Sequence, residues 1–208
     1  FPEYTGNLLQ FYNEDTEATE SNEVYAELQE ALPEELAVLE QSPATDQDSY
    51  NVTSAFAEQY GLESIGDLAS VDEALTLGGA PELEERPYGP TGLQEVYDVE
   101  VGFQATGDTT VDALVAGTIN IANVYSADPR IQSADLVTLD DPEGLFLASN
   151  VVPLVNADLA DELAEVLDPI SAALTPEGLV ALNVLSQDEQ QNPDEIATDW
   201  LTENGFLD

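Results

Sequence analysis

The stretch DSYNVTSAFAEQYGLESIGDLASVDEALTLGG, residues 48–79, decides the fold, because strand and helix signals alternate along it. Residues 49–53 have strand character, and Thr53 or Ser54 is suited to cap the helix that follows. Gly61 is suited to end that helix, and a second short helix leads to a buried strand at 75–77. Strands separated by single helices predict an α/β fold with mainly parallel sheets.

The same alternation extends to both sides of this stretch. Residues 1–6 predict the end of a strand that runs into a turn, and the acidic run 13–23 predicts a solvated loop. We expect helices at residues 22–32, 65–71, 93–97, 109–117, 159–174, 176–185 and 193–204, and further strands at 36–39, 99–104, 119–124, 136–139 and 145–155.

The composition describes a globular protein with an unusually acidic surface. Of 208 residues, 44 are Asp or Glu and only two are Lys or Arg, so the formal net charge is −42. The hydrophobic fraction of 43% is nevertheless that of a folded protein and not of a disordered acidic tail. Such a negative field repels phosphate backbones, which excludes nucleic-acid binding as a function, and it disfavours anionic membrane surfaces.

Several kinds of chemistry are excluded because the residues that perform them do not occur. The chain has no His and no Cys, which rules out a Ser-His-Asp triad, a Cys nucleophile and a conventional zinc site. Pairs of Asp at 46/48 and 140/141 resemble fragments of calcium loops, but both lack the ligand spacing of an EF-hand. We therefore expect no metal and no cofactor, and general acid–base work would fall to carboxylates or Tyr.

Two kinds of residue are candidates for ligand recognition. Tyr4, Tyr50 and Tyr125 stand at the ends of expected elements, where aromatic rings can form a cage around a quaternary ammonium, or simply cover a sheet edge. Arg86 offers a planar fork suited to a carboxylate, although an ion pair with the neighbouring Glu84 or Glu85 is an equally good interpretation. The second cation, Arg130, is expected to make local structural pairs.

Five motifs, in order, resemble one family. They are Pro2-Glu3-Tyr4-Thr5-Gly6, Asp48-Ser49-Tyr50, Glu85-Arg86-Pro87-Tyr88-Gly89 followed by Gly92-Leu93, Asn123-Val124-Tyr125-Ser126-Ala127-Asp128, and Ala197-Thr198-Asp199-Trp200-Leu201-Thr202-Glu203-Asn204-Gly205. Together they cover nearly the whole chain, and they are similar to the substrate-binding proteins of ABC importers for glycine betaine, choline and related osmoprotectants.

The resemblance implies a type II periplasmic-binding-protein-like fold, a two-lobed α/β clamp that closes on its ligand about a hinge. Residues 1–46 and 148–208 would form what is present of lobe one, and residues 47–147 would form lobe two. In members of the family further strands and helices of lobe one precede the Pro-Glu-Tyr-Thr-Gly motif, so the resemblance implies that this N-terminal portion is absent from the chain.

The resemblance also implies a set of ligand contacts. Tyr4, Tyr50 and Tyr125 would belong to the aromatic box around the trimethylammonium group, and Asp48 would lie beside the cation. Arg86 would reach the carboxylate of betaine from lobe two. Two further contacts complete the implied set: Asn7, at a position where many members have a hydroxyl residue, and Ser149, where a fourth aromatic ring often stands.

The expected function is that of a non-enzymatic binding module. It would carry a quaternary ammonium solute of the glycine betaine, choline, carnitine or proline betaine type to the membrane permease of an ABC importer. We expect it to be a monomer outside the cytoplasm, either in the periplasm or lipid-anchored at the cell surface. The alternatives are a carboxylate-dependent hydrolase, such as a glycoside hydrolase with paired Asp and Glu, and a non-catalytic acidic interaction domain.

Overall fold

The computed structural model describes residues 1–207, which fold into two compact units. Unit 1 consists of residues 1–47 and 147–208, and unit 2 consists of residues 48–146, so the chain passes between them twice. The expected lobes, residues 1–46 with 148–208 and residues 47–147, remain a prediction. No helix within residues 1–207 combines the length and the apolar character that crossing a membrane requires.

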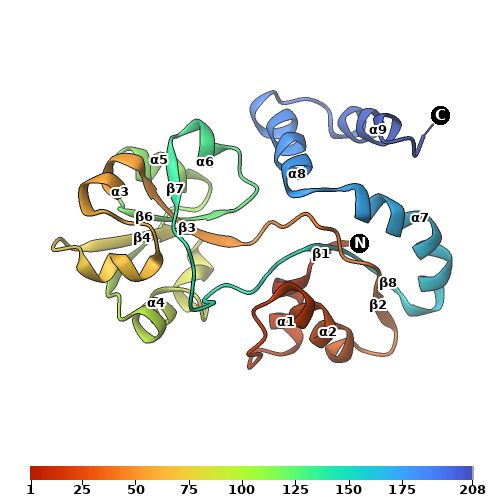
Figure 1. Ribbon diagram of the computed structural model, residues 1–208, viewed down its shortest axis with the longest axis horizontal. Coiled ribbons are helices and arrows are strands. Elements are labelled where there is room, and N and C mark those ends of the chain that lie inside the picture. The colour runs from red at the N-terminus through yellow and green to blue at the C-terminus, as the bar shows by residue number, and fades with distance from the viewer. Residues whose placement is uncertain (208) are drawn as a thin grey trace. The chain divides into compact units, whose positions relative to one another are not determined.

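Unit 2 is built on a five-stranded sheet with the strand order β5-β4-β6-β3-β7 (Figure 1). Strands β5, β4 and β6 run parallel, whereas β3 is antiparallel to both of its neighbours. The strands are β3 (Asp48–Thr53), β4 (Leu75–Gly79), β5 (Val101–Ala105), β6 (Ile121–Tyr125) and β7 (Leu136–Thr138). The helices are α3 (Ser54–Tyr60), η1 (Ile65–Ser70), η2 (Pro81–Glu85), α4 (Pro90–Tyr97), η3 (Gly107–Thr109), α5 (Thr110–Val115) and α6 (Arg130–Ser133).

The start of unit 2 forms as its sequence signals predict. The Thr53 side chain accepts a hydrogen bond from the backbone N–H of Phe56 and caps α3, and Gly61 ends the helix in the left-handed conformation at φ 68°. Both features are local, because a cap and a left-handed C-terminal residue depend on the side chain at that one position. The expected α/β class is therefore confirmed in this stretch.

The expectation of mainly parallel sheets is wrong. Strand β3 is antiparallel to β6, which is itself parallel to β4, so β3 and β4 run in opposite directions. Two short helices, α3 and η1, lie between β3 and β4, and together they return the chain to the end of the sheet at which β3 finished. The strand direction follows from that return, whereas a single crossover helix would give parallel strands.

The sheet of unit 2 buries side chains on both faces. Tyr50, Val52, Leu77 and Ile121 belong to a core on one face, under α3, η1 and α4. Ala122 and Val124, the alternate residues of β6, belong to a second core on the other face, with Val111 and Leu114 of α5. This alternation is the period-two pattern of a strand, and it fixes which residues of β3 and β6 share a face.

Unit 1 has a three-stranded antiparallel sheet in the order β1-β8-β2. Its strands are β1 (Pro2–Tyr4), β2 (Leu36–Val38) and β8 (Val151–Asn156). Helices α1 (Thr5–Tyr12) and α2 (Ser21–Ala31) pack on one face, as Figure 1 shows, around a core that includes Leu9, Val24, Leu28 and Val152. The sheet therefore has its well-packed core on the α1 and α2 side.

Two sequence expectations fail in unit 1. Residues 5–6 open helix α1 instead of a turn, because Gly6 serves close packing: an added Cβ would meet Ser149 Oγ and the carbonyl oxygen of Ala148. Strand β8 begins at Val151, six residues later than expected. The preceding apolar residues Leu145 and Phe146 are buried in the core of unit 2, so their hydrophobicity marks a buried loop and not a strand.

The C-terminal part of unit 1 is helical but sparsely buried. It contains η4 (Ala157–Leu159), α7 (Ala160–Ala173), α8 (Pro176–Asn183), the π-helical segment η5 (Val184–Asp188) and α9 (Pro193–Glu203). An apolar groove of about 420 Å³ runs between these helices and β8, and Leu167, Leu174 and Trp200 are among its lining residues. Trp200 stacks on Phe206 with the ring centroids 6.2 Å apart.

Candidate functional site

Four side chains gather at one end of the unit 2 sheet. In the pairing of β3 with β6, Asp48 lies opposite Tyr125 and Tyr50 lies opposite Asn123. Because residues two apart on a strand point to the same face, all four lie on the face that carries the Tyr50 core. Neighbouring strands therefore bring together residues that are more than 70 positions apart in the sequence.

The loop after β4 adds Arg86 and Tyr88 to this cluster. Helix η2 packs Leu83 where Gly79 leaves space, and the chain turns so closely at Gly89 that a Cβ there would collide with the carbonyl oxygen of Leu83. The hydroxyl of Tyr50 donates a hydrogen bond to the backbone carbonyl of Tyr88. This contact fastens the loop to β3 and places the Tyr88 side chain beside Asp48.

Asp48 is the one charged residue that is buried within residues 1–207, with an exposed fraction of 7%. Burial raises the pKa of its carboxyl, because a charged group loses its hydration there. Three neighbours act in the opposite direction: Asn123 and Tyr88 favour the carboxylate through their side chains, and the positive charge of Arg86 attracts it. Burial likewise raises the pKa of the Tyr88 and Tyr50 hydroxyls, so both rings stay neutral.

Arg86 keeps an unpaired charge. Within the described part of the chain, the single ion pair closer than 4 Å joins Arg130 to Asp128, so neither Glu84 nor Glu85 neutralises Arg86. Arg130 makes the local structural pair that was expected, with its Nε and Nη2 atoms on the two carboxylate oxygens of Asp128. The buried Nδ2 of Asn123 favours the Asp48 carboxylate, but it meets no acceptor in full hydrogen-bond geometry.

Tyr4, Asn7 and Ser149 belong to unit 1. Tyr4 is half-buried and its hydroxyl donates to Asp46 Oδ2 at 3.4 Å. The residue after it, Thr5, is tied to Asn150 by a backbone hydrogen bond of 3.0 Å. This connection fixes Tyr4 at the junction of β1 and α1, and Asn7 lies half-buried in the first turn of that helix.

Two of the expected contact residues are interior residues in this structure. Tyr50 has an exposed fraction of 0%, and its ring packs edge-on against Phe146 with the centroids 4.9 Å apart. Ser149 is 3% exposed, with its Oγ against the backbone at Gly6. In this structure Tyr50 supports the cluster from below and Ser149 supports the start of α1, and the contact of either residue with a ligand stays a prediction. Tyr125, by contrast, is 50% exposed.

Sequence reasoning missed Tyr88 and Asn123. The signal for Asn123 was available, because it stands two residues before Tyr125 on the same expected strand and so shares its face. The signal for Tyr88 was weaker. Only the turn at Gly89 places Tyr88 beside Asp48, and that turn depends on a close backbone approach that no periodicity indicates.

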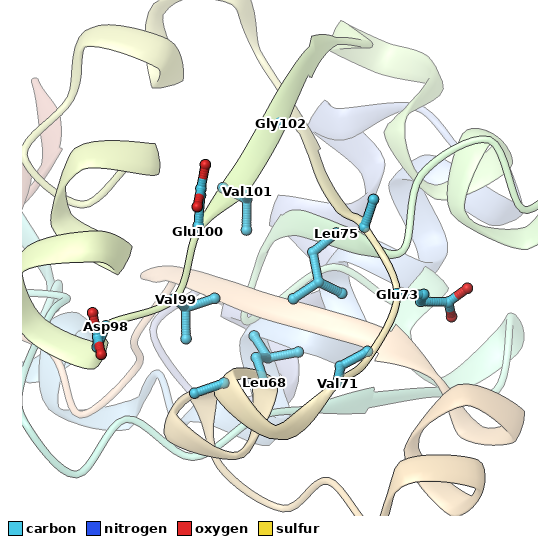
Figure 2. Close-up of a pocket in the computed structure, with 11 residues that line it drawn as sticks. Leu68, Val71, Glu73, Leu75, Asp98, Val99, Glu100, Val101 and Gly102 are labelled. Carbon is cyan, nitrogen blue, oxygen red and sulfur yellow. The ribbon is translucent and has the colours of Figure 1, made fainter.

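A hollow of about 550 Å³ in unit 2 lacks the kinds of side chain that the cluster around Asp48 contains. Figure 2 shows that Leu68, Leu75 and Val99 form its apolar floor, while the carboxylates of Glu73 and Asp98 point away from each other. None of the residues that line it is aromatic or cationic. Nor do residues 1–207 contain a group of acidic residues arranged to hold a metal ion.

Comparisons with known proteins identify the family of the chain. Residues 1–203 match the family model OpuAC, described as the substrate binding domain of ABC-type glycine betaine transport systems. The glycine betaine-binding protein YehZ of Escherichia coli is 28% identical over 225 residues, which cover 99% of this chain and 74% of the relative. A glycine-betaine-binding protein of Pseudomonas aeruginosa is also 28% identical, with 99% and 72% covered.

Solved structures show the same architecture. A glycine betaine/carnitine/choline ABC transporter structure aligns with a TM-score of 0.82 at 20% identity and covers 100% of this chain and 79% of that one. Ligand-free YehZ of Escherichia coli aligns with a TM-score of 0.71 at 25% identity, with 100% and 80% covered. The fold is that of type II periplasmic binding proteins. The chain belongs to the family of substrate-binding domains of ABC-type glycine betaine transport systems.

Proposed function

We propose that the protein binds a quaternary ammonium solute of the glycine betaine class and delivers it to the permease of an ABC importer. One observation carries the proposal. A chain with only two cationic side chains keeps one of them, Arg86, without an ion pair beside the only buried carboxylate in the described residues, Asp48. Arg86 and Asp48 influence each other's charge without forming an ion pair, and two opposite charges placed in this way match a ligand that carries both.

Each end of such a solute finds a suitable group in the cluster. The half-exposed ring of Tyr125 lies opposite Asp48 across the two strands, and a trimethylammonium group is attracted both by an aromatic face and by a nearby carboxylate. The guanidinium of Arg86 suits the carboxylate of betaine, to which it can donate two parallel hydrogen bonds. The buried Nδ2 of Asn123 is a further donor.

Tyr4 and Asn7 remain predictions from the resemblance. The family membership supports a non-enzymatic role outside the cytoplasm, as a monomer that meets its permease, and we include these points in the proposal. A glycoside hydrolase needs two carboxylates on either side of the scissile bond. The cluster offers one buried carboxylate, Asp48, so this alternative has less support among the residues that the structure describes.

Titration calorimetry with glycine betaine and with choline tests the proposal directly. We expect wild-type protein to bind betaine, and the Arg86→Ala variant to lose about tenfold or more in affinity for betaine but little for choline, which has no carboxylate. Arg130→Ala is the matched control, because it removes the same charge from an arginine that makes only a structural pair. No heat with either solute, under conditions in which the protein is folded, would reject the proposal.

The aromatic contacts have a separate test. Tyr125→Leu and Tyr4→Leu keep most of the apolar bulk but remove the ring, and each is expected to weaken betaine binding several-fold, since one cation–π contact contributes about 0.5–2 kcal/mol. Tyr60→Leu is the control, because Tyr60 is a half-buried tyrosine of unit 2 that is not among the expected ligand contacts, and its hydroxyl pairs with Glu73. Unchanged affinity in the Tyr125 variant would leave that ring as cover for the sheet edge. The same experiment with Asn7→Ala tests the remaining contact in unit 1.

A further inference from the structure

The Asp141 carboxylate organises the last loop of unit 2. Its Oδ1 accepts the backbone N–H of Leu145 at 2.9 Å, and its Oδ2 accepts that of Phe146 at 2.8 Å. The hydroxyl of Tyr97, from the end of α4, donates to the same carboxylate and accepts the N–H of Glu143 at 2.9 Å. The Asp141 carboxylate thus accepts hydrogen bonds from three residues. These bonds give this member of the 140/141 pair a structural role that does not need calcium.

This loop ends at Phe146, whose ring packs against the rings of Tyr50 and Tyr88. Phe146 packs edge-on against Tyr50 and lies 5.7 Å from the ring of Tyr88, tilted by 58°. The same Tyr88 presents its hydroxyl to Asp48, and its backbone carbonyl accepts the hydroxyl of Tyr50. Protein cores are close-packed, so each ring depends on its neighbours for its position. A displacement of Phe146 is therefore expected to shift the rings of both Tyr50 and Tyr88.

We propose that Asp141 and Tyr97 are positioning residues for the solute site: through the backbone of Phe146 they hold its ring against Tyr88 and keep the Tyr88 hydroxyl on Asp48. The proposal rests on the proposed function and extends it to two residues outside the cluster. The connection is geometric: the Asp141 carboxylate accepts the backbone N–H of Phe146, and the Phe146 ring packs on Tyr50 and Tyr88.

If Asp141 only stabilised its own loop, it would make the same hydrogen bonds. The measurement that distinguishes this role from a positioning role is the pKa of Asp48. The groups that face Asp48 are Arg86, Tyr88, Asn123 and its cross-strand neighbour Tyr125, with the Tyr50 hydroxyl below it. Of these, only Tyr88 and Tyr50 contact Phe146. Since the Tyr88 hydroxyl lowers the pKa of Asp48, losing that contact is expected to raise it.

The experiment compares Asp141→Asn and Tyr97→Phe with Tyr60→Phe. Tyr60 is half-buried and also donates its hydroxyl to a carboxylate of unit 2, Glu73 Oε1 at 3.1 Å, but in a solvent-exposed hydrogen bond that does not involve the Asp141 loop. The carboxyl carbon of Asp48 is titrated by NMR in ligand-free protein, and betaine affinity is measured by calorimetry. We expect a higher pKa of Asp48 and about fivefold weaker binding in Asp141→Asn, a smaller change of both in Tyr97→Phe, and wild-type behaviour in Tyr60→Phe.

The outcomes separate this inference from the proposed function. If Asp141→Asn is folded and both the Asp48 titration and the betaine affinity equal those of wild type, the positioning role is wrong. If Asp141→Asn does not fold, Tyr97→Phe decides in the same way, because it keeps both backbone hydrogen bonds to Asp141. If wild-type protein binds neither betaine nor choline while the Asp48 titration still moves in the variants, the function fails and the structural link from Asp141 to Asp48 stands.

Discussion

The two units differ in how completely their sheets are covered. The five strands of unit 2 have a hydrophobic core on each face, and Leu77 and Ile121 in its central strands have no exposed surface. The three strands of unit 1 have one core, on the side of α1 and α2, and helices α7, α8 and α9 contribute only Ser171 and Ile196 to the buried residues. Burial is the main source of folding free energy, so the two units should differ in stability.

The difference also separates the site residues. The cluster around Asp48 stands entirely on the better-covered unit, where strand register and the Asp141 loop hold it in place. Both Arg residues lie in unit 2 as well, so unit 1 is acidic without a single cationic side chain. The proposed recognition chemistry, which depends on fixed geometry, thus lies on the part of the molecule that packing fixes most firmly.

Hydrogen exchange gives the largest expected contrast between the units. In the 208-residue chain, backbone amides of β4 and β6 should exchange only on global opening of unit 2, whereas those of α7 to α9 should open locally. We expect protection factors that differ by about 100-fold or more, measured by mass spectrometry after proteolysis. Equal protection in α9 and β6 would break the comparison.

Core truncation sharpens the same contrast. Leu77→Ala removes a fully buried side chain from the centre of unit 2 and should cost about 2–5 kcal/mol in the free energy of unfolding. Leu167→Ala, in the wall of the α7 groove, removes a half-buried one and should cost less than about 1 kcal/mol. Denaturant titration of both variants checks the order, and a larger loss from Leu167 would contradict it.

Asp48→Asn should stabilise unit 2 at neutral pH. Burial raises the pKa of the Asp48 carboxyl, so the stability that its protonated form provides is complete below the unfolded pKa of about 4 and is lost as the pH rises through the folded value. A neutral amide avoids this loss, and we expect a melting temperature about 3 °C higher at pH 7, a difference that disappears toward pH 4. A lower melting temperature at pH 7 would show that Asn123, Tyr88 and Arg86 outweigh the burial of the charge.

Salt should have the smallest and most uneven effect. With a net charge of −42, repulsion between carboxylates destabilises the compact state, and salt screens it over about 10 Å at 0.1 M. Because both Arg residues are in unit 2, molar salt should raise the melting temperature of unit 1 more than that of unit 2. Calorimetric scans in dilute buffer and in molar salt measure this, and identical shifts in the two units would rule it out.

Local signals made much of the fold predictable. The Thr53 cap, the Gly61 terminator and the period-two alternation each depend on residues within one turn or one strand, and the structure contains all three. Strand direction did not follow from them, because the antiparallel pairing of β3 with β6 is set by contacts between residues more than 70 positions apart. Gly6 was misread for a related reason: its neighbour Ser149 is distant in the sequence.

The sequence indicated which residue types belong to the candidate site but not which of their side chains are buried. The motifs indicated the strand ends at Asp48 and Tyr125, and these two residues are directly opposite each other. The motifs did not distinguish Tyr50, which is an interior support, from Tyr125, which is half exposed, because side-chain burial depends on what the loop at Tyr88 covers. In the sequence, Asp141 was only half of an acidic pair. Its proposed role follows from the hydrogen bonds that its carboxylate accepts from the backbone N–H groups of Leu145 and Phe146.

The stacked ring of Trp200 has a practical consequence for separating the two units in solution. It is the only tryptophan in the sequence, and it lies in unit 1 against Phe206, whereas the aromatic cluster of unit 2 consists of tyrosines and a phenylalanine. Tryptophan emission, excited at the red edge of protein absorbance, therefore reports on unit 1 alone. Tyrosines occur in both units, so this single tryptophan is the intrinsic signal that distinguishes unit 1 from the proposed solute site at Asp48 without any added label.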